Sequence, residues 1–213
     1  NNFVQLFFGW EAVGLVSYLL IGFYFKRESA IFANLKAFLV NRVGDFGFLL
    51  GIGLVLAYFG GSLRYADVFA YLPNVQHATI QLFPGVEWSL MTVTCLLLFI
   101  GAMGKSAQFP LHVWLPDSME GPTPISALIH AATMVTAGLF MVSRMSPMYE
   151  LSTTALSVIM VVGAITALFM GFLGVIQNDI KRVVAYSTLS QLGYMTVALG
   201  ASAYSIAMFH VMT

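Results

Sequence analysis

Three residues that could carry protons lie inside apolar runs of this sequence: Glu11, Lys105 and His130. An ionisable side chain at membrane depth costs about 2.5–3.5 kcal/mol even on a lenient insertion scale, so such groups mark ion or substrate pathways. A nearby carboxylate stabilises a protonated lysine, and histidine can change its protonation state near neutral pH. These side-chain types can therefore take up, hold and release a proton.

The segment around Lys105 also predicts a broken helix. Lys105 follows the uncharged run 88–104, and Pro110 then removes a backbone donor that a continuing helix would need. A proline- or glycine-interrupted span beside a buried charge is typical of membrane proteins that build a polar site at the break.

Composition places the whole chain in a membrane. Charged residues make up 8% of the 213, whereas a soluble chain carries about a quarter. The mean hydropathy is +0.87, and the apolar runs are long enough to cross a bilayer as helices. The net charge is zero and the chain has no Lys/Arg cluster, which excludes nucleic acid as a partner class. The single cysteine, Cys95, lies in an apolar run and is interpreted as a packing residue.

The pattern predicts an all-α, polytopic membrane helix bundle with one discontinuous helix. Residues 60–87 are predicted to form a polar loop. Because the chain begins without Met and its last apolar run stops at Thr213, we expect it to be a piece of a longer polypeptide. The predicted elements are six spans at 3–25, 36–59, 88–115 (broken), 122–142, 151–176 and 183–200, with a truncated seventh from about 204.

Loop charges predict an orientation. Alternate loops carry five basic residues on one side and two on the other, and the positive-inside rule places the first set in the cytoplasm, matrix or stroma. The first set is Lys26, Arg27, Lys36, Lys181 and Arg182, and the second is Arg64 and Arg144.

Several polar residues have helical spacing. Arg42 and Asp45 are three apart, so they share a helix face and can neutralise one another. Two further stripes at i, i+4 and i+7 predict polar helix faces, which serve either as contacts between membrane helices or as part of a proton path. These stripes are Ser126, His130 and Thr133, and Ser187, Gln191 and Tyr194.

Three long motifs carry a resemblance to a known family. They are NRVGDFGFLLG at 41–51, GKSAQFPLHVWLPDSMEGPTPISALIHAATMVTAG at 104–138 and NDIKRVVAYSTLSQLGYM at 178–195. In this order they resemble the largest antiporter-like membrane subunit of proton-pumping NADH:quinone oxidoreductase, respiratory complex I. That family includes bacterial subunit L, mitochondrial subunit 5 and the chloroplast F subunit. The resemblance implies that 1–143 belongs to a first antiporter-like helix repeat and that 144–213 begins a second.

The resemblance also implies roles for individual residues. One set would form the proton-translocation axis, and a second set would tune or support it. The first set is Glu11, Lys105, His130 and His210, and the second is Arg42, Asp45, Asp179 and Lys181.

Chemistry and resemblance together suggest one mechanism. Lys105 would load a proton while Glu11 is near and release it toward His130 when Glu11 pairs elsewhere, for example with Arg42. Two structural readings stay open. Glu11 and Lys105 could be a pair that only holds two helices together, and Asp179 could simply cap a helix.

The resemblance implies a proton-translocating subunit in a bacterial inner membrane, with other membrane-arm subunits, lipid and protons as partners. No cofactor is expected in this chain; NADH oxidation, FMN, iron–sulfur clusters and quinone would belong to partner subunits. One alternative is the large subunit of a multi-subunit sodium/proton antiporter, which shares GKSAQFP. A remote one is a membrane electron carrier with haem on His112, His130 or His210.

Overall fold

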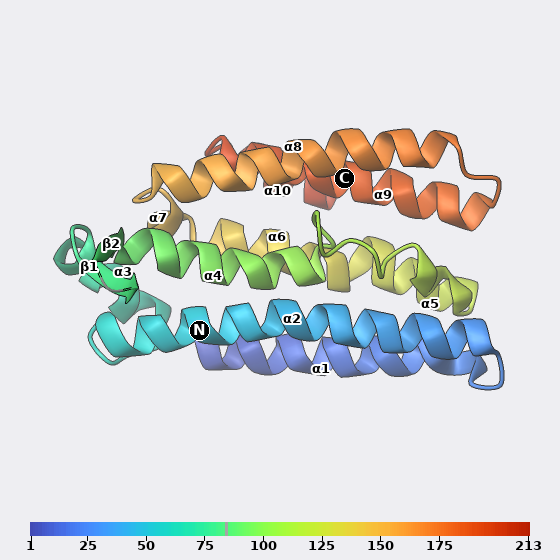
Figure 1. The fold of residues 1–213 in the computed structure, drawn as a ribbon, viewed down its shortest axis with the longest axis horizontal. Helices are drawn as coiled ribbons and strands as arrows, with labels where there is room; N and C mark the ends of the chain where they lie inside the picture. The colour runs from blue at the N-terminus through green and yellow to red at the C-terminus, as the bar shows by residue number, and fades with distance from the viewer. Residues whose placement is uncertain (84) are drawn as a thin grey trace.

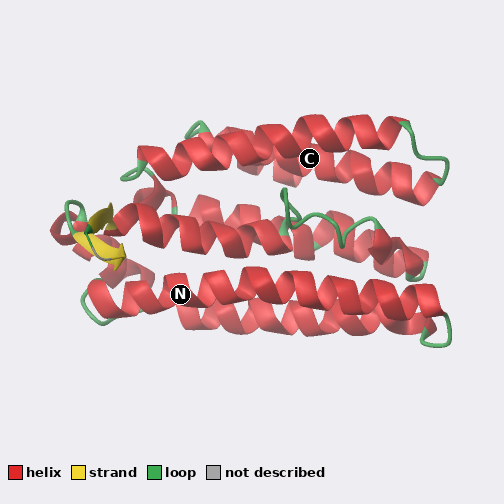
Figure 2. Ribbon diagram, in the orientation of Figure 1, coloured by secondary structure: helices red, strands yellow, loops and turns green. Residues whose placement is uncertain are grey.

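The computed structural model describes residues 1–83 and 85–213, which form a bundle of long helices lying side by side (Figures 1 and 2). The predicted polytopic helix bundle is thereby confirmed. The long helices are α1 (Phe3–Ile21), α2 (Glu28–Tyr58), α4 (Leu90–Lys105), α6 (Met134–Arg144), α8 (Thr153–Val175), α9 (Ile180–Gly200) and the shorter α10 (Tyr204–Met212).

Four helical segments of the described chain are long and apolar enough to cross a membrane: Phe3–Tyr24, Glu28–Tyr58, Thr123–Arg144 and Thr153–Val175. The apolar helix α4 is shorter, with 16 residues, because it ends at Lys105. The chain is therefore an integral, multi-pass membrane protein. α2 begins at Glu28 rather than near the predicted residue 36, so its first turns reach beyond the apolar run.

The predicted polar loop at 60–87 contains regular structure, which corrects that expectation. It holds α3 (Tyr65–Val75) and an antiparallel hairpin of β1 (Thr79–Phe83) and β2 (Val86–Ser89). Helical spacing explains α3, because its buried residues recur every three or four positions and form one apolar face. These residues are Tyr65, Val68, Leu72 and Val75.

The two ends of the bundle carry the charges as the loop pattern predicted. Arg27, Lys181 and Arg182 line one cavity of about 480 Å³ at one end. Residues of η1 (Gly22–Tyr24), η2 (Asp117–Glu120) and the α8–α9 turn line this cavity. Figure 1 shows the α1–α2 and α8–α9 turns at the same end of the bundle. At the other end, the Arg144 guanidinium lies 5.4 Å from the ring centre of Tyr65.

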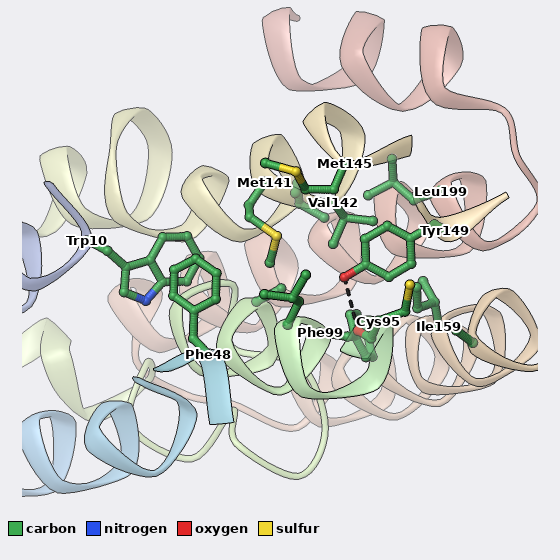
Figure 3. Close-up of a cluster of buried hydrophobic side chains, with 14 of the residues drawn as sticks. Trp10, Phe48, Cys95, Phe99, Met141, Val142, Met145, Tyr149, Ile159 and Leu199 are labelled. Atoms are coloured by element: carbon green, nitrogen blue, oxygen red, sulfur yellow. Dashed lines mark hydrogen bonds between the residues drawn. The ribbon is translucent and has the colours of Figure 1, made fainter. Parts of the chain in front are cut away.

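A buried apolar core joins the helices of the bundle. Figure 3 shows part of it, in which α7 (Ser146–Tyr149) places Tyr149 against α4. The Tyr149 hydroxyl donates to the Cys95 carbonyl at 3.2 Å, so the polar end of this fully buried ring has a partner. Cys95 is itself buried in this cluster, consistent with packing.

The predicted break after Lys105 is present, and several of the backbone groups around it have partners within the protein, as irregular backbone at membrane depth needs. α4 ends at Lys105, and residues 106–116 continue as turns. The Trp114 indole donates to the Gly104 carbonyl at 3.1 Å, which gives a partner to a carbonyl in the last helical turn. The amide of Phe109 donates to Thr166 Oγ1 of α8 at 3.0 Å.

The next span, predicted as a continuous helix, is also interrupted. It consists of α5 (Thr123–Ala127), a π-helical turn η3 (Leu128–Ala132) and α6, and Thr133 has the non-helical angles φ −130° and ψ −64°. The Thr133 hydroxyl donates to the carbonyl of Leu128, five residues earlier. A π turn inserts an extra residue into the helix, so it rotates the following side chains to a new face.

Close backbone contact joins α8 to α9. A Cβ atom on Gly193 would lie 2.5 Å from the amide nitrogen of Ala167, and one on Gly163 would lie 2.7 Å from that of Val197. Small residues of this kind let membrane helices approach closely. The close packing of α8 on α9 therefore requires glycine, which has no Cβ atom, at Gly163 and Gly193.

We expect Gly193→Ala to destabilise the α8–α9 pair by about 1–3 kcal/mol, because the added methyl group meets rigid backbone rather than a movable side chain. The matched control is Gly171→Ala, whose Cβ would meet only Ser190 Oγ at 3.5 Å. Thermal unfolding of the purified complex checks the prediction. Equal midpoints for the two variants would contradict it.

Candidate functional site

Lys105 is the buried centre of an ionic cluster that also contains Asp45, Arg42 and Glu11. Only 1% of its side chain is exposed, and its Nζ lies 3.3 Å from both carboxylate oxygens of Asp45. Asp45 also accepts a hydrogen bond of 2.8 Å from the indole nitrogen of Trp10. The buried ammonium is thus paired with a carboxylate that is itself hydrogen-bonded, as a buried ion pair requires.

Glu11 is paired with Arg42, not with Lys105. Arg42 Nη1 donates to Glu11 Oε2, and Arg42 Nε lies 3.7 Å from Asp45 Oδ2. Arg42 and Asp45 are therefore neighbours, as predicted. Glu11 has the Arg42 partner that the predicted mechanism gives it when it is not near Lys105, and its approach to Lys105 remains a prediction. Asp45 is the carboxylate that holds Lys105 because it faces α4, whereas Glu11 is bound to Arg42 and is 27% exposed.

Glycines bring Asp45 to Lys105. A Cβ atom on Gly44 would lie 3.0 Å from the Cα of Gly104, so α2 and α4 touch backbone to backbone beside the ion pair. Gly47 and Gly51 continue the same contact along α2 against Ile100 and Leu98. The three glycines at i, i+3 and i+7 are visible in the sequence, and they are the signal by which the Asp45–Lys105 contact could have been predicted.

His130 lies in the π turn η3 and is 5% exposed. Its Nε2 is 2.9 Å from the hydroxyl of Ser118 in η2, while its Nδ1 is buried with no hydrogen-bond partner in the described part of the chain. Ser118 was missed from the sequence, because its approach to His130 depends on the folding back of residues 106–120. No hydrogen bond among the described residues joins Lys105 to His130 directly.

His130 lines two cavities. One, of about 280 Å³, is lined by Ser126, Lys181 and Thr188 among others, and the second, of about 390 Å³, reaches His210 and Gln191. His130 and Thr188 line both. The two cavities therefore form a row of spaces that adjoin at His130 and Thr188, with Lys181 lining the first and His210 the second.

The predicted stripe of Ser126, His130 and Thr133 is only partly correct. Ser126 and His130 line the same cavity, whereas Thr133 lines a different one beside α1. The π turn between them explains the difference, because it shifts the residues that follow.

The second stripe includes the partner of His210. Gln191 Oε1 lies 3.0 Å from His210 Nε2, and Ser187 lines the same cavity.

Asp179 and Lys181 make structural contacts at the end of this row. Asp179 caps α9 by accepting from the Lys181 amide at 3.2 Å. The Lys181 ammonium donates to the carbonyls of Met119 and Gly121, each at 3.3 Å. Both residues also line the charged cavity at this end of the bundle, so they lie where the row of spaces begins. Their predicted part in proton uptake remains a prediction.

The sequence matches, over residues 1–213, the family described as NADH:quinone oxidoreductase/Mrp antiporter, transmembrane. The chain belongs to this family. Among the described residues of this member, no group of three or more His, Cys, Asp or Glu side chains is placed to hold a metal ion.

Relatives within the family are very similar in sequence. NADH-quinone oxidoreductase subunit L of Neisseria meningitidis is 94% identical over the whole chain, which covers 32% of that protein. Subunit L of Rhodobacter capsulatus is 58% identical, with 30% of its length covered. NADH-ubiquinone oxidoreductase chain 5 of Marchantia polymorpha is 55% identical, with 32% covered. The chain thus spans about a third of the length of these relatives.

Solved structures have the same fold. A chain of the Mrp complex from Dietzia sp. DQ12-45-1b superposes on 99% of this chain with a TM-score of 0.83 and 27% identity, and 22% of that chain is covered. A chain of the archaeal membrane-bound sulfane sulfur reductase superposes on the whole chain with a TM-score of 0.82 and 24% identity, and 42% of it is covered. The antiporter-like fold predicted from the motifs is thereby confirmed.

Proposed function

We propose that this chain is part of a proton-translocating membrane-arm subunit of NADH:quinone oxidoreductase, and that its partners are the other subunits of that complex in a bacterial inner membrane. The observation that carries the proposal is the buried Lys105 ammonium, held by Asp45 beside a second ion pair between Glu11 and Arg42. Subunit L relatives at 94% and 58% identity favour this function.

The cluster can exchange charges because its members are close enough to change partners. Asp45 lies between two cations, Lys105 and Arg42, while Arg42 lies between two carboxylates, Asp45 and Glu11. When Glu11 moves toward Lys105, the protonated lysine is stabilised; when the carboxylates turn to Arg42, a desolvated ammonium is left and releases its proton more readily. The structure corresponds to the arrangement in which Glu11 is paired with Arg42.

The energy required is within reach of such an exchange. Moving one proton charge against each 100 mV costs about 2.3 kcal/mol. The approach or loss of one carboxylate changes the proton affinity of a neighbouring group by about 1–3 pKa units, and each unit corresponds to about 1.36 kcal/mol. The free-energy change from exchanging one ion pair is therefore of the right order to move one proton against 100 mV.

His130 is the proposed relay between this cluster and the row of cavities. One ring nitrogen is held by Ser118 and the other has no protein partner among the described residues, an arrangement that suits accepting and passing a proton. The cavities on its two sides connect it with Lys181 at one end and with His210 at the other.

The test uses inside-out membrane vesicles that contain the complete complex and measures NADH-driven proton uptake with a pH-sensitive dye. We expect His130→Gln to lower the uptake rate at least about tenfold, since amide replaces a titratable ring and general acid–base groups contribute about 10²–10⁴-fold. The matched control is His77→Gln, because His77 is exposed in the turn before β1. Unchanged proton uptake in His130→Gln would show that His130 is not the relay.

The sodium/proton antiporter is the second candidate function, favoured by the likeness to a chain of the Mrp complex. The same vesicles distinguish the two. Proton uptake that requires NADH and persists without sodium supports the proposed function, whereas proton movement that requires a sodium gradient and no NADH supports the antiporter.

A further inference from the structure

Two residues of α1 that the proposed mechanism does not use border the Lys105 ammonium. Trp10 and Gly14 are four residues apart, so they lie on the same face of the helix, one turn apart. Trp10 is 3% exposed and its ring centre is 6.0 Å from Lys105 Nζ. A Cβ atom on Gly14 would lie 2.9 Å from the same Nζ.

Gly14 also borders the second cation of the cluster. The same Cβ atom would lie 3.1 Å from Arg42 Nη2. The space beside Gly14 therefore adjoins both Lys105 and Arg42, and Arg42 is in turn bound to Glu11. An ammonium that leaves Asp45 for Glu11 has to pass along this part of α1.

Trp10 holds Asp45, the carboxylate from which the Lys105 ammonium would depart. Its indole nitrogen donates to Asp45 Oδ1 at 2.8 Å, and its ring packs on Phe48 of α2 with centres 4.7 Å apart. Figure 3 shows the two neighbouring rings, which are tilted by 42° relative to one another. The indole is held by this packing, so it keeps the Asp45 carboxylate directed at α4.

We propose that Trp10 and Gly14 are positioning residues for proton transfer at Lys105: Trp10 orients the carboxylate that holds the ammonium, and Gly14 leaves the space through which the ammonium changes partner. The inference rests on the proposed function, because it assigns these residues to the same ionic cluster. Neither residue exchanges a proton itself; each acts through Lys105.

The experiment measures NADH-driven proton uptake by the complete complex in vesicles over a range of pH, per amount of assembled complex. Gly14→Ala is expected to fold, because the atom that must yield is the tip of a flexible lysine rather than backbone. We expect it to lower the uptake rate roughly tenfold, since small misplacements of a reacting group have effects of this size. The control is Gly9→Ala on the same helix, where a Cβ atom meets nothing within 4 Å.

Trp10→Phe is the second variant, and it keeps an aromatic ring while removing the donor to Asp45. Its control is Trp88→Phe, because Trp88 lies in β2 and is 43% exposed. Both test variants should also change the shape of the pH profile, whereas a purely structural defect lowers the rate by the same factor at every pH. This readout separates positioning from packing.

The outcomes are distinct. This inference is overturned if Gly14→Ala and Trp10→Phe have the same uptake rates and pH profiles as their controls. It is also overturned if Gly14→Ala fails to assemble and Trp10→Phe behaves as the wild type. If Lys105→Ala abolishes uptake at the same time, the proposed function survives. If Lys105→Ala leaves uptake unchanged, the proposed function itself fails.

Discussion

Lys105→Ala in the complete complex is expected to abolish proton uptake at this subunit while NADH oxidation by a soluble electron acceptor continues. The substitution removes the group that we propose carries the proton, and no other lysine of the described chain contacts Asp45. The proposed role requires a group that can be charged and neutral in turn at this position, which alanine cannot supply. Dye-detected uptake in vesicles, normalised to assembled complex, measures the effect.

The control for this substitution is Lys26→Ala. Lys26 is exposed in the turn between α1 and α2, so its loss removes the same charge without touching the cluster. Wild-type proton uptake per NADH oxidised in Lys105→Ala would show that Lys105 serves only to hold helices together.

Asp45→Asn is expected to have the second-largest effect, because it leaves Lys105 buried without its carboxylate. Removing one partner of a buried ion pair costs about 3–5 kcal/mol. The indole of Trp10 also loses its charged acceptor. We therefore expect a large loss of assembled complex together with loss of proton uptake, measured by native gel and vesicle assay.

A double variant separates stability from function at this pair. Asp45→Asn with Lys105→Gln removes both buried charges, so assembly should recover while proton uptake stays lost. The matched control is Asp67→Asn, since Asp67 and Arg64 form a similar i, i+3 pair, 4.0 Å apart, that is exposed. Recovery of uptake in the double variant would contradict the proposed function, and a stable Asp45→Asn single variant would contradict the structural prediction.

The helix bundle and the break after Lys105 were predictable because each depends on local sequence. Long apolar runs specify membrane helices, and Pro110 cannot continue one. The structure within residues 60–87 could have been predicted as well, since the helical spacing of Tyr65, Val68 and Leu72 was present in the sequence. The π turn at His130 gave no comparable signal, because π turns depend on packing with neighbouring helices.

The pairing within the ionic cluster could be predicted only in part. Residue types identified Lys105, Glu11, Arg42 and Asp45 as members, but which carboxylate faces Lys105 depends on the rotation of α1 and α2 about their axes. The close contact of Gly44 with Gly104 fixes that rotation for α2. The roles of these four cluster members in proton movement, and those of His130, His210, Asp179 and Lys181, remain predictions.

The bond from the Phe109 amide to Thr166 has a mechanical consequence. It fastens the unwound stretch after Lys105 to α8, and α8 is locked to α9 through backbone contacts at Gly163 and Gly193. A tilt of α8 together with α9 would therefore pull on the stretch that begins after Lys105. Through this hydrogen bond we expect a movement of α8 to reach the residues that directly follow Lys105.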